Sequence, residues 1–342
     1  MSQVNDLLAS VRSQMDASPA ALLEARTRLQ LVCDVASSFP GALRTYHSGS
    51  LPVHTMNAPV TDGDGGLVLN RAFYPGLGPD GGGDSPEKVV QEVCDHLGPL
   101  VREKYPNAVI RKSKRGPKVH FHEEEEGQDP TVDLVIAMNR KEGTGIWIPD
   151  LRSTTWEASD PEHHVQLLND GTPHFRSTRR IIIRLAKAWN KQFYQPGVSS
   201  FQLSVWALSF VEPGIGVAKG LANLFDQAAA RLEAGDSTPD PAGVSPDLRL
   251  LVPAKTVADR LRKAANAMDL AVSSDDATTV EEAMGTVFPD YIDSVSASAS
   301  SLKSAVGVIA NMKPVTAVAL GINVTATVDT SFRAFGGKTA DV

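Results

Sequence analysis

The run Val132-Asp133-Leu134-Val135-Ile136-Ala137 is the strongest strand signal in the sequence. Its β-branched and aliphatic residues predict a buried strand. Asp133 is the one acid within this run, and burying a carboxylate is costly unless it is paired or bound to a metal ion. Asp133 is therefore a candidate functional residue whose charge needs compensation.

A second acidic feature, Asp62-Gly63-Asp64, precedes the short apolar run at 66–69. Two Asp at positions i and i+2 of a strand project to the same face, about 6 to 7 Å apart. If Asp133 lies on the neighbouring strand, about 4.8 Å away, three carboxylates meet. They would repel unless cations neutralised them, so we expect two Mg²⁺ ions, or Mn²⁺ in their place. Asp-Gly-Asp alone is more often a turn, so the prediction depends on the combination with Asp133.

The pair Gly49-Ser50 follows a predicted strand at 43–47. Glycine lets the backbone approach a phosphate, and the Ser50 hydroxyl with the amides of a following helix can hold phosphate oxygens. Together these features predict a nucleotidyltransferase: Asp62 and Asp64 hold the metals that bind the triphosphate, and Asp133 binds the ion that lowers the pKa of the attacking hydroxyl. Gly65 and Gly66 predict unusual flexibility directly after the acidic pair.

Periodicity divides the chain into three parts. Residues 1–150 combine two N-terminal helices and a helix from Pro86 with short strands, and form the predicted catalytic core. Residues 151–290 show helical periodicity almost throughout, which predicts a second, helical lobe. The tail at 291–342 has no assigned fold. The predicted fold class is α/β (α+β), with a mixed sheet in the core.

These motifs resemble the active-site motifs of the bacterial cGAS/DncV-like nucleotidyltransferases (CD-NTases), relatives of cyclic GMP-AMP synthase and oligoadenylate synthase. The resemblance is carried by Thr45-Tyr46-His47-Ser48-Gly49-Ser50, Asp62-Gly63-Asp64, Thr131-Val132-Asp133-Leu134, Arg184-Leu185-Ala186-Lys187-Ala188-Trp189-Asn190-Lys191 and Ser199-Ser200-Phe201-Gln202-Leu203. It covers about residues 20–290. It implies a polymerase-beta-like core, an oligoadenylate-synthase-like helical lobe, and synthesis of cyclic or linear oligonucleotide second messengers from nucleoside triphosphates in anti-phage (CBASS) signalling. A downstream effector would respond to the product.

The same resemblance implies nucleotide contacts in the helical lobe. Lys187 and Ser200 would contact the donor triphosphate, and Phe201 would lie where the family often stacks a base. A point-charge lysine and a hydroxyl suit phosphates, and an aromatic face suits a base. A place in the helix core is an equal expectation for Phe201. Ser204 departs from the Glu that many members carry in this helix.

Several histidines and tryptophans have simpler interpretations. His120 and His122 beside Glu123–Glu126 are more typical of a solvated acidic hairpin than of a zinc site. One of His163 and His164 is expected to line the nucleotide cleft. Trp147 and Trp156 fall near the lobe junction, where pockets commonly form.

Composition limits the class of protein. The net charge of −7 argues against a stable nucleic-acid partner. No stretch has the roughly 18 uninterrupted apolar residues of a membrane span, and no secretory signal is visible, so we expect a cytoplasmic protein without a membrane partner. Two alternatives stay open: a nucleotidyltransferase that modifies RNA or protein as a toxin, and a catalytically inactive nucleotide sensor.

Overall fold

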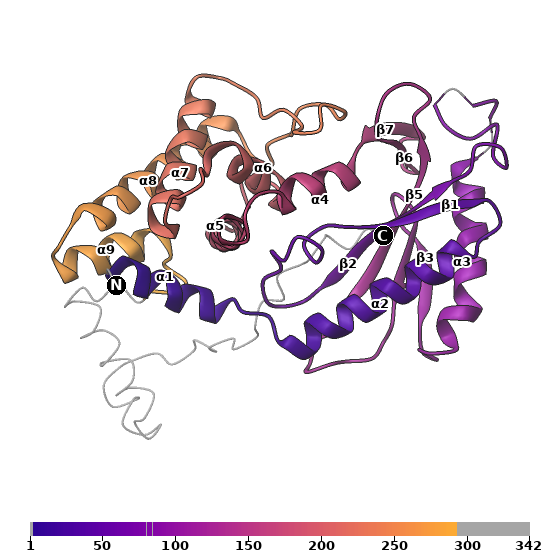
Figure 1. The fold of residues 1–342 in the computed structure, drawn as a ribbon, viewed down its shortest axis with the longest axis horizontal. Helices are drawn as coiled ribbons and strands as arrows, with labels where there is room; N and C mark the ends of the chain where they lie inside the picture. The colour runs from indigo at the N-terminus through magenta and orange to yellow at the C-terminus, as the bar shows by residue number, and fades with distance from the viewer. Residues whose placement is uncertain (1–2, 80, 84, 293–342) are drawn as a thin grey trace, which may run out of the picture.

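The computed structural model describes residues 3–79, 81–83 and 85–292. Within these residues a seven-stranded sheet and a group of helices form two lobes (Figure 1). The tail predicted at 291–342 lies outside the description from residue 293 onward. The strands are β1 (Ala42–Ser48), β2 (Asp62–Leu69), β3 (Val109–Lys112), β4 (Pro117–His120), β5 (Thr131–Asn139), β6 (Ile146–Asp150) and β7 (Thr155–Ser159).

The sheet is mixed, with the order β1-β2-β5-β4-β3, and β6 joins β5 to β7. β2 and β5 are parallel and pair without a slip from Asp62↔Thr131 to Leu69↔Met138. The remaining strand pairs are antiparallel. The predicted mixed sheet is confirmed, and it places the two acidic strands side by side.

One face of this sheet is covered by helices α2 (Pro19–Ser37) and α3 (Pro86–Arg102). Alternate residues of β5, from Val132 to Met138, join α2 and α3 in a single apolar core. Because side chains alternate along a strand, Asp133 projects from the opposite face. Helix packing on one face therefore turns the acids toward the other.

The second lobe is helical, as the sequence predicts. Its helices are α4 (Pro161–Asn169), α5 (Pro173–Lys191), α6 (Ser200–Phe210), α7 (Val217–Glu233), α8 (Ala254–Ser273) and α9 (Ala277–Val287). Their buried residues form a core separate from that of the sheet. Within the described part of the chain, no helix is long and apolar enough to cross a membrane.

The packing departs from the predicted division at two places. Helix α1 (Gln3–Gln14) belongs to the helical lobe, because its apolar stripe of Val4, Leu8 and Val11 is buried in that core. At the other boundary the sheet continues past residue 150 into β7, whose exposed and half-buried residues give little apolar signal. Helix α1 therefore lies beside the helices of the second lobe, although the sheet separates them in sequence (Figure 1).

Candidate active site

Three carboxylates meet at the face of the sheet that α2 and α3 leave uncovered. Asp62 and Asp64 extend from β2 and Asp133 from β5, and one oxygen of each lies within 4.8 Å of the others. Asp64 and Asp133 are direct partners in the parallel register. The expected gathering of the three acids is confirmed. All three are partly exposed, so a cation can reach them.

A row of side chains crosses the sheet through Asp133. Ser48, Asp64, Asp133, Lys118 and Arg111 are successive register partners on β1, β2, β5, β4 and β3. Lys118 Nζ lies 2.9 Å from Asp133 Oδ2. Because β4 and β2 flank β5 on opposite sides, this ammonium approaches Asp133 from the side away from Asp64 and does not separate the carboxylates.

Gly49 directly follows β1 and lies against the side chain of Asp64. Its φ is +72°, a conformation in which a side chain is strained, and a Cβ there would overlap Asp64 Oδ2. The glycine therefore leaves room for the carboxylate. Gly65 and Gly66 do not form the flexible segment that the sequence predicts, because both are buried within β2, Gly66 beneath the ring of Tyr46.

Ser50 begins a series of turns over residues 50–54 and not the helix that the sequence interpretation requires. Amides of a helix N-terminus are therefore not available beside Gly49, and that part of the prediction is wrong. The turn is closed by the Thr55 amide, which donates to the Ser50 carbonyl at 3.0 Å. Ser50 Oγ contacts Met56 Sδ at 3.4 Å, and Ser50 lines a cavity between the two lobes that Asp62 and Asp64 also line.

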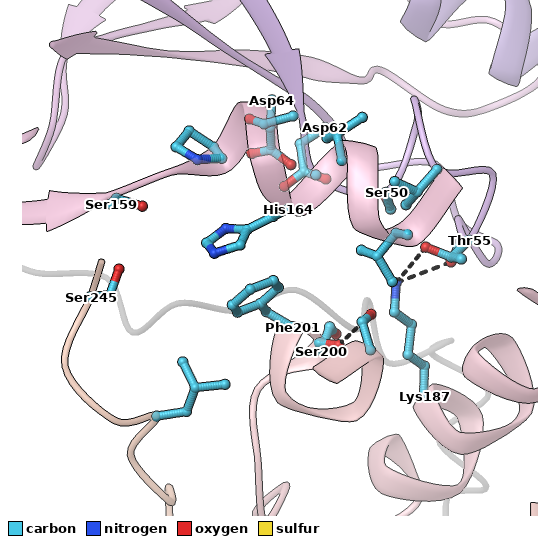
Figure 2. Close-up of a pocket in the computed structure, with 18 of the residues that line it drawn as sticks. Ser50, Thr55, Asp62, Asp64, Ser159, His164, Lys187, Ser200, Phe201 and Ser245 are labelled. Atoms are coloured by element: carbon cyan, nitrogen blue, oxygen red, sulfur yellow. Dashed lines mark hydrogen bonds between the residues drawn. The ribbon is translucent and has the colours of Figure 1, made fainter. Parts of the chain in front are cut away.

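Lys187 reaches this loop from α5. It is 8% exposed, and its Nζ donates to the carbonyl and to Oγ1 of Thr55, both at 3.1 Å (Figure 2). Burial, with repulsion from Lys191 and Arg184, lowers the pKa of Lys187 to about 8, although Asp64 and Asp62 oppose the shift. Lys191, one turn further along α5, has its pKa lowered by burial and raised again by Asp62.

Helices α4 and α6 also contribute side chains to the wall of the cavity (Figure 2). Phe201 is only half-buried and packs against His164, with ring centroids 4.7 Å apart. Ser200 begins α6, and Ser204 donates to its carbonyl at 3.2 Å. Phe201 therefore borders the cavity and is not enclosed in the helix core, and His164 is the member of the histidine pair that lines it.

His164 also connects α4 to the loop at 240–245, which lines another part of the cavity. Its Nε2 lies 2.5 Å from Asp240 Oδ1, and Asp240 accepts from the amides of Val244 and Ser245 at 3.0 and 2.8 Å. Burial opposes ionisation, but these hydrogen bonds and His164 together keep the pKa of Asp240 below its ordinary value. Trp147 and Trp156 also line the cavity, as their position at the lobe junction predicts.

The cavity between the lobes measures about 2190 Å³. Every sequence-predicted nucleotide-binding residue lines it: Gly49, Ser50, Lys187, Ser200 and Phe201. Asp62 and Asp64 line the same cavity. Oxygen donors that carry negative charge are what Mg²⁺ and Mn²⁺ prefer, so the three carboxylates fit a divalent ion.

Sequence reasoning missed three further residues of this site. Lys191 carried a signal, since it follows Lys187 by four residues and shares its helix face. Thr55 carried none, because a hydroxyl in a loop gives no indication of a buried lysine in the other lobe. Lys118 lies in a short strand whose pairing with β5 only the fold establishes.

Comparison with known proteins gives a fold but no sequence relative. No protein-family model matches the chain, and no curated protein matches it in sequence. The structure of the Bradyrhizobium diazoefficiens CD-NTase CdnG in complex with GTP matches with a TM-score of 0.63 and 14% identity, over 84% of this chain and 96% of that one.

Two further solved structures agree. Escherichia coli MS115-1 CdnC with ATP has a TM-score of 0.61 and 14% identity, over 84% of this chain and 98% of that one. The Vibrio cholerae DncV cyclic AMP-GMP synthase with a linear intermediate has a TM-score of 0.51 and 12% identity, over 84% of this chain and 86% of that one. At such identities the likeness establishes the shared fold.

Proposed function

We propose, from the CD-NTase fold of this chain and from its three carboxylates, that it is a metal-dependent nucleotidyltransferase. It would join nucleoside triphosphates into a cyclic or linear oligonucleotide second messenger for anti-phage (CBASS) signalling. The observation that carries the proposal is the meeting of Asp62, Asp64 and Asp133 within 4.8 Å. The proposed division is a catalytic core at 1–150, a helical lobe at 151–290 and a tail at 291–342, except that α1 packs with the helical lobe and β7 completes the sheet of the core.

In the proposed reaction a ribose hydroxyl attacks the α-phosphorus of a triphosphate. A new P–O bond forms, the bond to pyrophosphate breaks in line with it, and the hydroxyl proton is lost beside Asp133. Two Mg²⁺ or Mn²⁺ ions held by Asp62, Asp64 and Asp133 would neutralise the phosphates and acidify the hydroxyl.

The remaining contacts would come from the chain itself. Lys187, with Lys191 beside it, would supply positive charge to the triphosphate, and the hydroxyls of Ser50 and Ser200 would hold phosphate oxygens. Gly49 would keep the backbone clear of Asp64. Phe201 would offer a ring face to a base at the wall opposite the acids.

Cavity size favours a reaction between two nucleotides. A site for one small ligand typically occupies about 300 to 1000 Å³, whereas this cavity measures about 2190 Å³. Donor and acceptor nucleotides could therefore lie in it together. A cytoplasmic location and an effector that responds to the product belong to the same proposal.

Product analysis tests this function. We expect the full chain, incubated with all four ribonucleoside triphosphates and Mg²⁺ or Mn²⁺, to release pyrophosphate and a small oligonucleotide that chromatography separates. The variant Asp62→Asn with Asp64→Asn should form none. Transfer of labelled nucleotide to protein or added RNA, with no small product, would favour the toxin alternative. No product under any condition would favour a sensor.

A further inference from the structure

Lys118 stands at the candidate metal site without any part in the proposed chemistry. Its Nζ lies 2.9 Å from Asp133 Oδ2, and the two side chains are 26% and 23% exposed. The contact is built into the fold, because Lys118 and Asp133 are direct partners in the antiparallel register of β4 and β5. It is the cationic neighbour of the third carboxylate.

The charges of the site suggest what this contact does. The ammonium of Lys118 already neutralises the charge of Asp133, and it repels any further cation that approaches the same carboxylate. The negative charges of a bound triphosphate would offset this repulsion. Lys118 therefore makes the second ion unfavourable in the nucleotide-free protein.

We propose that Lys118 is a built-in counter-ion of Asp133 that makes metal loading at this carboxylate depend on the nucleotide. This inference rests on the proposed function, since it takes the three acids to be metal ligands. Lys118 is thus a positioning residue that acts through Asp133. Premature occupation of Asp133 would be suppressed, and the ion would enter together with the phosphates.

A purely orienting role would have the opposite consequence. If Lys118 only held Asp133 in a metal-binding rotamer, its removal would weaken metal binding. If it competes with the ion, its removal strengthens binding. Even at the dielectric constant of water, a unit charge about 5 Å from a divalent ion changes affinity by roughly tenfold.

The test measures Mn²⁺ binding to the full chain without nucleotide, through the electron paramagnetic resonance signal of free Mn²⁺. Lys118→Met should bind Mn²⁺ about tenfold more tightly than the wild type, or bind a second ion, and Lys118→Gln should do the same. Lys118→Arg should keep the wild-type affinity. The gain should vanish when Asp133→Asn is added to Lys118→Met.

Arg111→Met is the matched control. Arg111 is the register partner of Lys118 on β3, one strand further from Asp133, so its loss removes an equal charge from the same face. We expect it to leave Mn²⁺ affinity within about twofold of the wild type. A gain as large as that of Lys118→Met would show a general charge effect and overturn the inference.

Two outcomes separate this inference from the function on which it rests. Mn²⁺ binding that Lys118→Met leaves unchanged or weakens overturns the counter-ion role alone. Absence of Mn²⁺ binding from both the wild type and Lys118→Met at millimolar concentration overturns the metal-dependent function as well. Circular dichroism confirms that each variant is folded before binding is measured.

Discussion

At the scale of single residues, the site depends on Gly49, because this residue has no side chain. The carboxylate of Asp64 occupies the space where a Cβ of residue 49 would lie. A methyl group there would force the carboxylate of Asp64 out of its present position. Gly49 is therefore needed for the three-carboxylate site because it leaves space for Asp64.

Gly49→Ala tests this relation. We expect activity and Mn²⁺ affinity to fall at least tenfold, because Asp64 must move. Gly127→Ala is the control, since Gly127 has the same φ of +72° but nothing within 4 Å of its added Cβ. Both variants should lose about 1 kcal/mol or more of unfolding free energy from backbone strain. Equal activity of the two variants would contradict the role given to Gly49.

The depressed pKa of Lys187, about 8, predicts how substrate affinity depends on pH. Below pH 8 the ammonium is charged and can bind triphosphate, and above it the neutral amine cannot. The KM for nucleoside triphosphates should therefore rise as the pH increases through about 8. Lys187→Arg should remove the rise, because arginine stays charged. A wild-type KM that is constant from pH 7 to 9 would exclude this assignment.

The free energy of unfolding should also depend on pH through the protonation of Lys187. The folded-state pKa of Lys187 lies below the ordinary value of 10.5, so between about pH 8 and 10.5 the unfolded chain binds the additional proton. The free energy of unfolding should therefore increase with pH over this window. Denaturant titrations at several pH values should show the increase in the wild type and its loss in Lys187→Met.

At the scale of elements, a buried arginine of α2 links this helix to the segment that leads into β5. Arg28 is 1% exposed and pairs with Glu24 and Asp129 at 2.8 and 2.5 Å. It also donates to the carbonyls of Glu123 and Pro130. This contact fixes the start of the strand that carries Asp133.

Arg28→Met should destabilise the protein by about 2 to 3 kcal/mol, because two part-buried carboxylates and two backbone carbonyls lose their donor. Arg262→Met is the control, since Arg262 pairs with Glu233 and Asp226 where all three side chains are about one-third to one-half exposed. Its loss should cost about 1 kcal/mol or less. Chemical denaturation measures both, and similar costs would show that burial of Arg28 carries no special weight.

Periodicity predicted the helices well because their apolar stripes are long. The strands were harder, since β2 begins with Asp62-Gly63-Asp64-Gly65, residues of low strand propensity. Pairing with β1 and β5 imposes the strand there. β7 escapes prediction for a different reason: its residues are exposed or half-buried and give little apolar signal, so that pairing with β6 defines the strand.

For the site, sequence identified the residues whose chemistry is unusual in its local setting, such as an acid in an apolar strand. It could not identify residues defined by a distant partner. Lys118 and Thr55 are ordinary in sequence, and only the register of β4 and the approach of α5 give them a place beside Asp133 and Lys187.

At the scale of the whole molecule, the cavity is shared between two lobes that contact each other directly. Arg184 of α5 donates to Asn57 Oδ1 at 2.9 Å, and Arg44 of β1 pairs with Glu162 of α4 at 2.7 Å. The acids belong to one lobe, and Lys187 and Phe201 belong to the other. A bound nucleotide would therefore hold the lobes together.

Ligand binding should consequently stabilise the whole chain. A non-hydrolysable analogue of the substrate, with Mg²⁺ and at a concentration of 100 times its Kd, should add about 2.7 kcal/mol to the free energy of unfolding. Asp62→Asn with Asp64→Asn should lose the part of this gain that depends on Mg²⁺. Thermal unfolding with and without Mg²⁺ measures it, and an equal gain in the double variant would separate nucleotide binding from the acids.

The claim that three carboxylates hold divalent ions beneath a triphosphate is tested most directly by anomalous diffraction. Crystals of the full chain grown with Mn²⁺ and a non-hydrolysable nucleoside triphosphate should show Mn²⁺ peaks in contact with Asp62, Asp64 and Asp133. The phosphates should lie between those peaks and Lys187. An ordered triphosphate elsewhere in the molecule, or these carboxylates free of Mn²⁺ beside a bound nucleotide, would contradict the account.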